Sequence, residues 1–562
     1  MRAALAAACV ALAVYAGAWR GGPVWDDGII VHDIVPLLSS GSRILFPPSD
    51  VVLLDRYYRP LVYATYATDY YLAGGGAFAR HATGIFGHAI CAALVAWLAW
   101  QVQPAPRRDP LVALVAGTLF AVHPIHVESV AWMSGRADIL AALALLVMFW
   151  NLLRFDWSAG ALAAVSFFLA LCSKESAVCG LALAGLALAR RRDRRSIVPC
   201  LLMLSGALVL YGGLRWRALG GWVSPEQPIV ARPDAVLRAL YALLFELRAL
   251  VWPFPANPFV PDIPVPDVAS WLVLIVAVST FGLFAWRVAR GGDSLPLVGM
   301  SWVGIALLPS LVVATHEVAT VAIAERYEYI PSIGLCWVLG SLVGSARTLG
   351  GWRARVSTAI ALGLVLAGGY TTMSRVGIWH DNRGFWTAAA RGAPGHCLPL
   401  TQLADDDLLE GRAATAEQQY RVALAGKCPL KTRAYVLGRL GLTAYQQNRL
   451  AEAEANFSAA RQLDPGDFFA PYGLGLCAAT NANAEIRAGR DASELLTQAV
   501  HQLQAAVALR SRFADAHYLL GEVLNVRGDG DQARVEWQTA VQVDPTSPAA
   551  KQARAALASA SE

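Results

Sequence analysis

Long apolar runs, almost free of charge, recur along the chain between Ala3 and about Tyr370. Each is long enough for a helix to cross a hydrocarbon core of about 30 Å. Only 15% of the 562 residues are charged, against roughly a quarter in an ordinary soluble domain. The runs therefore predict an all-α fold with a polytopic membrane domain over residues 1–375, and they exclude a wholly soluble protein.

Eleven of these runs are predicted to be transmembrane helices: 3–19, 82–102, 110–123, 136–153, 159–172, 176–190, 197–213, 268–286, 296–313, 329–345 and 356–372. A twelfth candidate, 235–253, contains Arg238, Glu246 and Arg248, and charged side chains are expensive at the middle of a bilayer. We predict that this segment lies in the interface or re-enters the membrane without crossing it.

Arginine clusters beside the apolar runs predict the orientation, because basic short loops stay in the cytoplasm. The clusters are Arg107–Arg108, 190–195, Arg287 with Arg290, and Arg347 with Arg353 and Arg355. With a cytoplasmic N-terminus and eleven crossings, all four clusters lie on the cytoplasmic side, whereas a crossing at 235–253 puts the last two outside. The C-terminal part of the chain is then expected outside, in a periplasm or lumen.

A repeat of 34 residues follows the membrane domain. Leu440-Gly441, Ala453, Phe457, Ala460 and Pro465 have tetratricopeptide spacing, and Leu520-Gly521, Ala533, Trp537, Ala540 and Pro545 repeat it at identical offsets. Weaker copies begin near Cys397 and at Tyr472. We predict a tetratricopeptide α-solenoid of about four units over 397–562, after a linker over 376–396. Such arrays bind an extended peptide or partner protein, or only stabilise a complex.

The cysteine pattern and the net charge limit the kinds of metal site and partner that the chain could have. The nine cysteines form no CxxC pair and no cluster of zinc-finger spacing, so structural zinc is not expected. Cys397 and Cys428 begin and end the first repeat, and an outside location permits a disulfide between them. The net charge of +5 is small and the arginines lie beside apolar runs, so no nucleic-acid partner is implied.

Two adjacent acids, Asp26 and Asp27, lie in the longest stretch of the membrane domain that is not predicted to cross, 21–80. A partly desolvated carboxylate at a membrane face can have a raised pKa and act as a general base, or hold a metal ion. A solvated loop or a helix cap would explain the same residues, so the spacing alone leaves the role of the pair open.

Several cations are predicted on the outer face, where they are least expected. Arg59, Lys174 and Arg326 lie at outer ends of predicted helices or in outer loops, as does Arg56. A guanidinium fork matches phosphate geometry, so their convergence indicates an anionic ligand such as a lipid phosphate. Taken singly, each could instead be an interfacial anchor or pair with Glu175 or Glu325.

The stretch 119–138 carries the other polar candidates. His123, His126 and Glu128 could be read as metal ligands, but Pro124 interrupts the helix and nothing completes a recognised zinc site. We expect these three residues at a substrate cleft, in hydrogen-bonding roles. Arg136 and Asp138 are expected to form an ion pair or a second phosphate contact.

Read in order, these motifs resemble the transmembrane and tetratricopeptide repeat-containing proteins. The resemblance rests on Trp25-Asp26-Asp27, Tyr58-Arg59-Pro60-Leu61, 119–138, Ser173-Lys174-Glu175, and Glu325-Arg326-Tyr327 with Tyr329-Ile330-Pro331-Ser332. It extends over nearly the whole chain, including the repeats and the Trp379 to Trp386 segment. The stretch from His123 to Asp138 is its most specific part.

The resemblance implies a class C glycosyltransferase of the O-mannosyltransferase type, which uses a polyprenyl-phosphate sugar as donor on the non-cytoplasmic face. Asp26 and Asp27 then match the acidic pair of the first outer loop. Asp26 is favoured as the base that deprotonates an acceptor hydroxyl, with Asp27 as the alternative, and inversion at the anomeric carbon follows. Arg59, Lys174 and Arg326 would neutralise the phosphate, and His123, His126, Glu128, Arg136, Glu175 and Glu325 would line the cleft. No cofactor is certain, although a divalent metal is possible.

Two further expectations follow. A composition rich in Ala, Arg and Trp but poor in Lys is typical of a GC-rich bacterial genome, which predicts a bacterial inner-membrane protein with periplasmic repeats. Its partners would be membrane lipid, the lipid-linked donor, and a polypeptide held by the repeats. A membrane-anchored scaffold without catalysis and an O-oligosaccharide ligase remain the alternatives.

Overall fold

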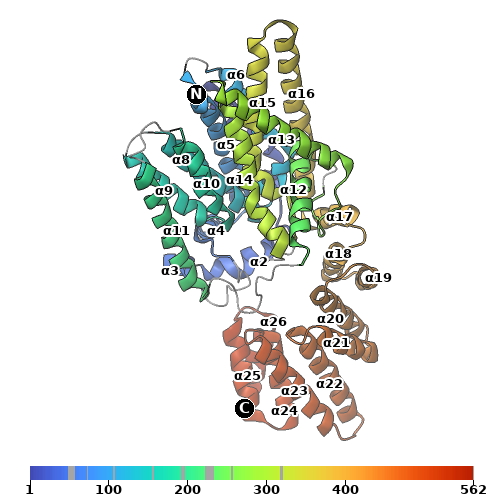
Figure 1. The fold of residues 1–562 in the computed structure, drawn as a ribbon. Coiled ribbons are helices and arrows are strands. Elements are labelled where there is room, and N and C mark those ends of the chain that lie inside the picture. The colour runs from blue at the N-terminus through green and yellow to red at the C-terminus, as the bar shows by residue number, and fades with distance from the viewer. Residues whose placement is uncertain are drawn as a thin grey trace. The chain divides into compact units, whose positions relative to one another are not determined.

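The chain folds into two compact helical units, Met1–Gly392 and Ala393–Glu562, in a computed structural model (Figure 1). It describes residues 1–38, 40–47, 57–71, 74–105, 108–154, 157–190, 197–221, 233–254, 257–316 and 321–560. These residues contain helices, turns and two isolated β-bridges but no strand, as an all-α fold requires. Arg56, Arg107 and 191–195 lie outside the described residues.

The first unit is a bundle built mainly of long helices (Figure 1). Its α-helices are α1 (Arg2–Val14), α2 (Asp27–Ile29), α3 (Gly41–Leu45), α4 (Pro60–Tyr71), α5 (Ala77–Val102), α6 (Pro110–Val122), α7 (Val127–Ala131), α8 (Arg136–Leu153), α9 (Trp157–Leu171), α10 (Gly180–Leu188), α11 (Ile197–Leu219), α12 (Ala235–Val251), α13 (Val268–Ala289), α14 (Leu295–His316), α15 (Tyr329–Thr348), α16 (Gly351–Val376) and α17 (Asn382–Gly392). Short turns of 3-10 helix connect several of them, including η6 (Pro124–His126), η7 (Met133–Gly135), η8 (Glu175–Cys179), η10 (Glu325–Glu328) and η11 (Gly377–Trp379).

Within the described residues, seven helices are long and apolar enough to cross a membrane: α5, η7 with α8, α11, α13, α14, η10 with α15, and α16 with η11. An eighth span results if α6 and the segment Pro124–Ala131, which are bent by 46°, count as one. The remaining predicted crossings correspond to α1, α9 and α10, which are apolar but shorter. The chain is thus a multi-pass membrane protein, and the number eleven stays a prediction.

The helices differ in how much of their surface the bundle covers. In α5, α8 and α15, 61–72% of the most apolar window is buried, whereas in α13 and α16 only 11% and 17% are. Apolar residues that face outward in this way suit a hydrocarbon environment. α12 is not among the candidate spans, and its Glu246 is buried and accepts a hydrogen bond from the Ser310 hydroxyl of α14 (Oγ to Oε2, 2.8 Å).

Polar contacts bring together the ends of the bundle that carry the arginine clusters. Arg190, after α10, donates to Val102 O at the end of α5 (2.6 Å) and lies 2.5 Å from Ser294 Oγ before α14. Arg347, in the last turn of α15, pairs with Asp109 at the start of α6 (3.4 Å). Arg190 and Arg347, which belong to different clusters, therefore both lie where α5 ends and α6 begins, as the predicted orientation requires.

The segment 376–396, expected to be a linker, is largely helical. It contains η11 and α17, and residues up to Gly392 group with the first unit. Phe385 and Trp386 of α17 are fully enclosed there. The boundary between the units therefore lies at Gly392 and Ala393, because these aromatic side chains bury their surface in the membrane unit.

The second unit consists of four helical hairpins and a final helix. The hairpins are α18 (Cys397–Leu409) with α19 (Ala413–Ala425), α20 (Leu430–Gln446) with α21 (Leu450–Leu463), α22 (Phe469–Arg487) with α23 (Ser493–Leu509), and α24 (Ala514–Arg527) with α25 (Gly530–Val543); α26 (Pro548–Ser559) follows. A Cβ atom at Gly441 would lie 2.9 Å from the ring of Phe457, and one at Gly521 only 2.5 Å from Trp537. The small residue makes room for the aromatic one in each repeat, which explains their fixed spacing.

Cys397 and Cys428 form a disulfide, with their Cα atoms 5.2 Å apart. The bond closes the first hairpin at the end where Lys427 N donates to Gly395 O (2.7 Å). This confirms the predicted pairing. Of the seven cysteines without a disulfide, six are buried and Cys9 is exposed.

The disulfide makes a testable prediction about the first repeat. Because it closes a loop over a sequence separation of 31 residues, a Cys397→Ser/Cys428→Ser variant should lose about 3–4 kcal/mol of that hairpin's stability. Intact mass should rise by two hydrogens on reduction. Alkylation of both residues in unreduced, denatured protein would contradict the assignment, and Cys477, buried in the same unit without a disulfide, serves as the internal control for labelling.

Candidate active site

The acidic pair lies at the start of α2, where Asp26 is the N-cap residue and Asp27 the first helical residue, at the end of the bundle opposite the arginine clusters. Asp27 is buried and accepts three hydrogen bonds: from Val24 N–H (3.1 Å), from Ser134 N–H (3.2 Å) and from the Ser134 hydroxyl (2.7 Å). Asp26 is partly exposed and lies 3.2 Å from the same hydroxyl. Since a hydroxyl has one proton, Asp27 is the anchored carboxylate, and Asp26 is the one free to accept a proton.

Burial raises the pKa of Asp26 above its ordinary value, against the lowering effects of Ser134 and of the charges on Arg326 and Arg59. Burial, and secondarily the charge of Asp26, raise the pKa of Asp27 to about 7. Two carboxylates held this close resist simultaneous ionisation. A raised pKa makes Asp26 a stronger base than an aspartate in water.

Three cations that the sequence singled out converge beside this pair. Arg59 lies over the ring of Tyr57 (4.1 Å), while Lys174 and Arg326 both lie 5.1 Å from the ring centroid of Tyr327. The charges of Arg59 and Arg326 each lower the pKa of Lys174, although burial is the larger cause. The structure therefore brings together residues from α4, the α9 to η8 turn and η10 at one place.

Each of these cations has an acidic partner. Arg59 donates from Nε (3.0 Å) and Nη2 (2.8 Å) to Glu175 Oε2. The Lys174 ammonium pairs with Asp138, and Glu128 accepts from both the backbone N–H (2.9 Å) and the guanidinium of Arg326. Glu175 and Glu128 thus belong to the site, but as orienting partners of the cations.

Arg215 is a fourth cation of the site, and sequence reasoning missed it. It lies near the end of α11, two residues beyond the limit predicted for that crossing, and approaches Glu175 Oε1 at 3.4 Å. One turn earlier, the Tyr211 hydroxyl donates to Tyr58 O (3.2 Å) and holds α11 against the Arg59 segment. The sequence did contain a signal for Arg215, namely a charged residue at the outer end of an apolar helix.

Arg136 and Asp138 do not pair with each other, because Asp138 binds Lys174. The Arg136 guanidinium is buried between α4 and α5, where it lies 2.5 Å from Asp69 Oδ2 and 3.3 Å from Thr65 Oγ1 and also donates to Arg80 O. Its side chain is 1% exposed. The expectation that Arg136 lines the cleft is therefore wrong, because it is enclosed and its donors are used in packing.

The histidines are also packing residues. His126 is fully buried, with its ring nitrogens 2.9 Å from Phe120 O and 2.7 Å from Ser332 Oγ. His123 bonds Leu250 O through Nε2 (3.1 Å) and accepts from Ile125 N–H. The ring nitrogens of both histidines are hydrogen-bonded to neighbouring backbone or side-chain atoms. The predicted role at a substrate cleft is therefore wrong for His126, which is fully buried, and His123 has both nitrogens occupied.

Glu325 has a structural partner as well. Its carboxylate pairs with Arg375 of α16, which also donates to Pro124 O (3.1 Å). The pair ties the last helix of the bundle to η6 and η10. Glu325 thus helps to hold η10, which also carries Arg326, against α16.

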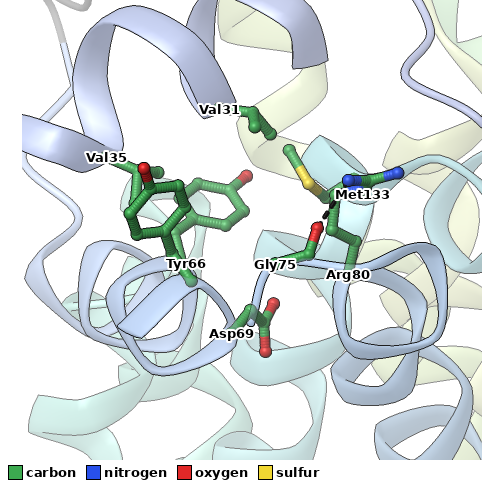
Figure 2. A pocket seen from close by; sticks show the side chains of 8 residues that line it. Val31, Val35, Tyr66, Asp69, Gly75, Arg80 and Met133 are labelled. Atoms are coloured by element: carbon green, nitrogen blue, oxygen red, sulfur yellow. Dashed lines mark hydrogen bonds between the residues drawn. The ribbon is translucent and has the colours of Figure 1, made fainter. Parts of the chain in front are cut away.

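A shallow hollow lies near the acidic pair, between α4, α5 and the segment after α2 (Figure 2). It is lined by Val31, Val35, Tyr66, Asp69, Tyr70, Gly75, Arg80 and Met133. Its cation, Arg80, donates to Gly75 O (2.6 Å), and Asp69 is held by Arg136. Arg59, Lys174 and Arg326 are not among the lining residues, so this hollow lacks the cluster of cations that a phosphate requires. The candidate site therefore lies at Asp26 and Asp27 and at those three cations.

The described ranges contain no group of three or more His, Cys, Asp or Glu side chains arranged to hold a metal ion. At the acidic pair, Asp27 accepts its hydrogen bonds from two backbone N–H groups and one hydroxyl.

The fold and the site together define a class: a multi-pass membrane protein with an acidic pair beside several cations, followed by helical repeats. The chain is 24% identical over 476 residues to human protein O-mannosyl-transferase TMTC4, covering 70% of this chain and 62% of that protein. It is 29% identical over 219 residues to Drosophila melanogaster protein O-mannosyl-transferase Tmtc2, covering 35% and 23%. The chain thus spans about three fifths of the length of TMTC4.

Shorter matches agree with these, such as 38% identity over 92 residues to human protein O-mannosyl-transferase TMTC1, covering 16% of this chain and 10% of that one. No protein-family model matches. Among solved structures, the tetratricopeptide protein YrrB matches with a TM-score of 0.23 and 18% identity, over 34% of this chain and 87% of that one.

Proposed function

We propose that this protein is a membrane glycosyltransferase that transfers a sugar, with mannose favoured, from a polyprenyl-phosphate donor to a hydroxyl of a polypeptide. The observation that carries the proposal is the partly exposed Asp26, held next to the anchored Asp27 and within the electrostatic influence of Arg59 and Arg326. A base facing cations is what transfer from a phosphate leaving group needs. The similarity to proteins named O-mannosyl-transferases supports the same reaction.

The reaction assigns a task to each group. Asp26 takes the proton of the acceptor hydroxyl, and the oxygen forms a bond to the anomeric carbon from the face opposite the phosphate. The bond between that carbon and the phosphate oxygen breaks, its electrons remain on the oxygen, and polyprenyl phosphate leaves. Configuration inverts. Arg59, Lys174 and Arg326 stabilise the charge that develops on the phosphate, and Asp27 fixes the loop through Ser134.

The cations of the site support an anionic ligand. Lys174 pairs with Asp138, Arg326 with Glu128, and both Arg59 and Arg215 with Glu175. Arg59, Arg215 and Glu175 all keep part of their side chains exposed. Partly exposed guanidinium groups at a membrane face suit a lipid phosphate.

Two features support a non-cytoplasmic site in a chain of eleven crossings. The arginine clusters lie at the end of the bundle opposite the acids, and basic loops favour the cytoplasm. The repeats contain a disulfide, which persists in oxidising compartments. We therefore propose that the repeats lie outside the cytoplasm, where they bind the polypeptide acceptor. The Ala- and Arg-rich, Lys-poor composition supports an inner-membrane enzyme of a bacterium with periplasmic repeats.

The test is a transfer assay with the full-length protein in membranes. Labelled mannose on a synthetic polyprenyl phosphate is offered with periplasmic protein, and the wild type is compared with an Asp26→Asn/Asp27→Asn variant. We expect incorporation by the wild type and none by the variant. Equal incorporation, or none with any lipid-linked sugar, would favour a non-catalytic scaffold, and transfer only from diphosphate-linked oligosaccharide would favour a ligase.

A further inference from the structure

The first residue of α17, Asn382, contacts the loop that carries the acidic pair although 357 positions separate it from Trp25. Its side-chain oxygen accepts two hydrogen bonds, from Trp25 N–H (3.0 Å) and from Trp386 Nε1–H (3.0 Å). The backbone N–H of the residue before Asp26 is therefore held by a side chain from outside the membrane bundle's crossings.

Aromatic rings of the same helix enclose the Trp25 side chain. The Trp25 ring lies 5.4 Å from that of Trp386 and 5.6 Å from that of Phe385, centroid to centroid, and it stacks on Trp132 at 5.6 Å. Trp386 and Phe385 are fully buried. Aromatic contacts of this kind each contribute about 0.5–1.5 kcal/mol beyond their buried area, so α17 fixes both the backbone and the ring of Trp25.

Trp25 adopts a conformation that it would not keep without such support. Its φ is +58°, one of two non-glycine residues with positive φ among those the structure describes. A bulky side chain in this region costs on the order of 1–3 kcal/mol. The strained residue directly precedes Asp26, so the direction of the Asp26 carboxylate depends on the contacts that hold Trp25.

We propose that Asn382, with the rings of α17, is a positioning device for Asp26: it holds Trp25 in its strained conformation and so directs the catalytic carboxylate toward the cations. The role of Asp26 in this inference rests on the proposed function. The placement of the loop by Asn382 does not depend on that function and can be measured separately. α17 is thereby part of the active site's support and not a linker.

The test compares two substitutions of Asn382 in the full-length protein. Asn382→Ala removes the acceptor, and we expect kcat for mannose transfer to fall about 10- to 100-fold, with KM for the donor unchanged, because misplacing a reacting group by about 1 Å costs this much. Asn382→Asp keeps an acceptor oxygen and should retain most of kcat. Its added charge should raise the pKa of Asp26 and move the acid limb of the pH profile upward.

A second readout is independent of activity. Hydrogen exchange of the peptide containing Trp25 to Asp27 should be faster in Asn382→Ala and close to wild type in Asn382→Asp. Arg391→Ala, which removes an exposed side chain at the other end of α17, is the matched control and should change neither readout. If Asn382→Ala does not fold, Phe385→Leu, which removes one ring at similar volume, should give the same pattern with a smaller loss.

The outcomes separate the two proposals. Unchanged exchange and unchanged kcat in Asn382→Ala would overturn the positioning role. A wild type that transfers no sugar would overturn the proposed function, and the exchange measurement would still decide whether Asn382 holds the loop. A parallel rise in donor KM and fall in stability, without rescue by Asn382→Asp, would assign Asn382 a merely structural role.

Discussion

Asp26→Asn is expected to lower kcat for sugar transfer by about 10²- to 10⁴-fold, the range for loss of a general base, with little change in folding. The amide keeps an oxygen near the Ser134 hydroxyl, which lies 3.2 Å from the Asp26 carboxylate, but it cannot take the acceptor's proton. Asp27→Asn should behave differently. Asp27 accepts three hydrogen bonds, so the amide leaves a buried donor unsatisfied at a cost of about 1–3 kcal/mol.

Both variants would be compared by kcat in membranes and by thermal midpoint in detergent. The pH dependence provides a further check: since burial raises the pKa of Asp26, activity should fall as pH drops through a value above the usual range for aspartate, because the protonated acid is no base. An active Asp26→Asn enzyme together with a folded but inactive Asp27→Asn enzyme would identify Asp27, and not Asp26, as the base.

Arg136→Met is expected to be the most destabilising substitution in the membrane unit, lowering the free energy of unfolding by about 3–5 kcal/mol, the usual cost of removing one partner of a buried ion pair. The Arg136 side chain is 1% exposed and binds Asp69 at 2.5 Å. Asp69→Asn in the same chain should recover part of the loss. Protein that still folds should keep its KM for the donor, because Arg136 does not face the cations.

The matched control is Arg347→Met. Arg347 also pairs with an aspartate, Asp109, but at 3.4 Å and with 48% of its side chain exposed, and exposed pairs contribute about 0–1 kcal/mol. Thermal midpoints of the three variants in one detergent make the comparison. A raised donor KM with an unchanged thermal midpoint in Arg136→Met would contradict this assignment and show that Arg136 contributes to the substrate cleft.

The features that the sequence predicted correctly are those that depend on local composition and spacing. Each predicted crossing is helical in the structure, and the small and aromatic positions of the repeats, such as Gly441 with Phe457, meet as their spacing requires. The Cys397–Cys428 disulfide followed from the position of both residues at one end of a hairpin. Asp26, Arg59, Lys174 and Arg326 were predicted on one face because orientation depends on the charges of short loops.

Tertiary structure alone decided which charged groups face each other. Glu128 pairs with Arg326, 198 positions away, while Glu325, next to Arg326 in the chain, pairs with Arg375. Likewise Asn382, in a segment that composition marks as a linker, supports the acidic loop. Hydropathy and spacing are properties of a window of sequence and determine helices, faces and repeats. Partners across helices depend on the packing of whole elements, which brings together residues hundreds of positions apart and leaves no periodic signal in the chain.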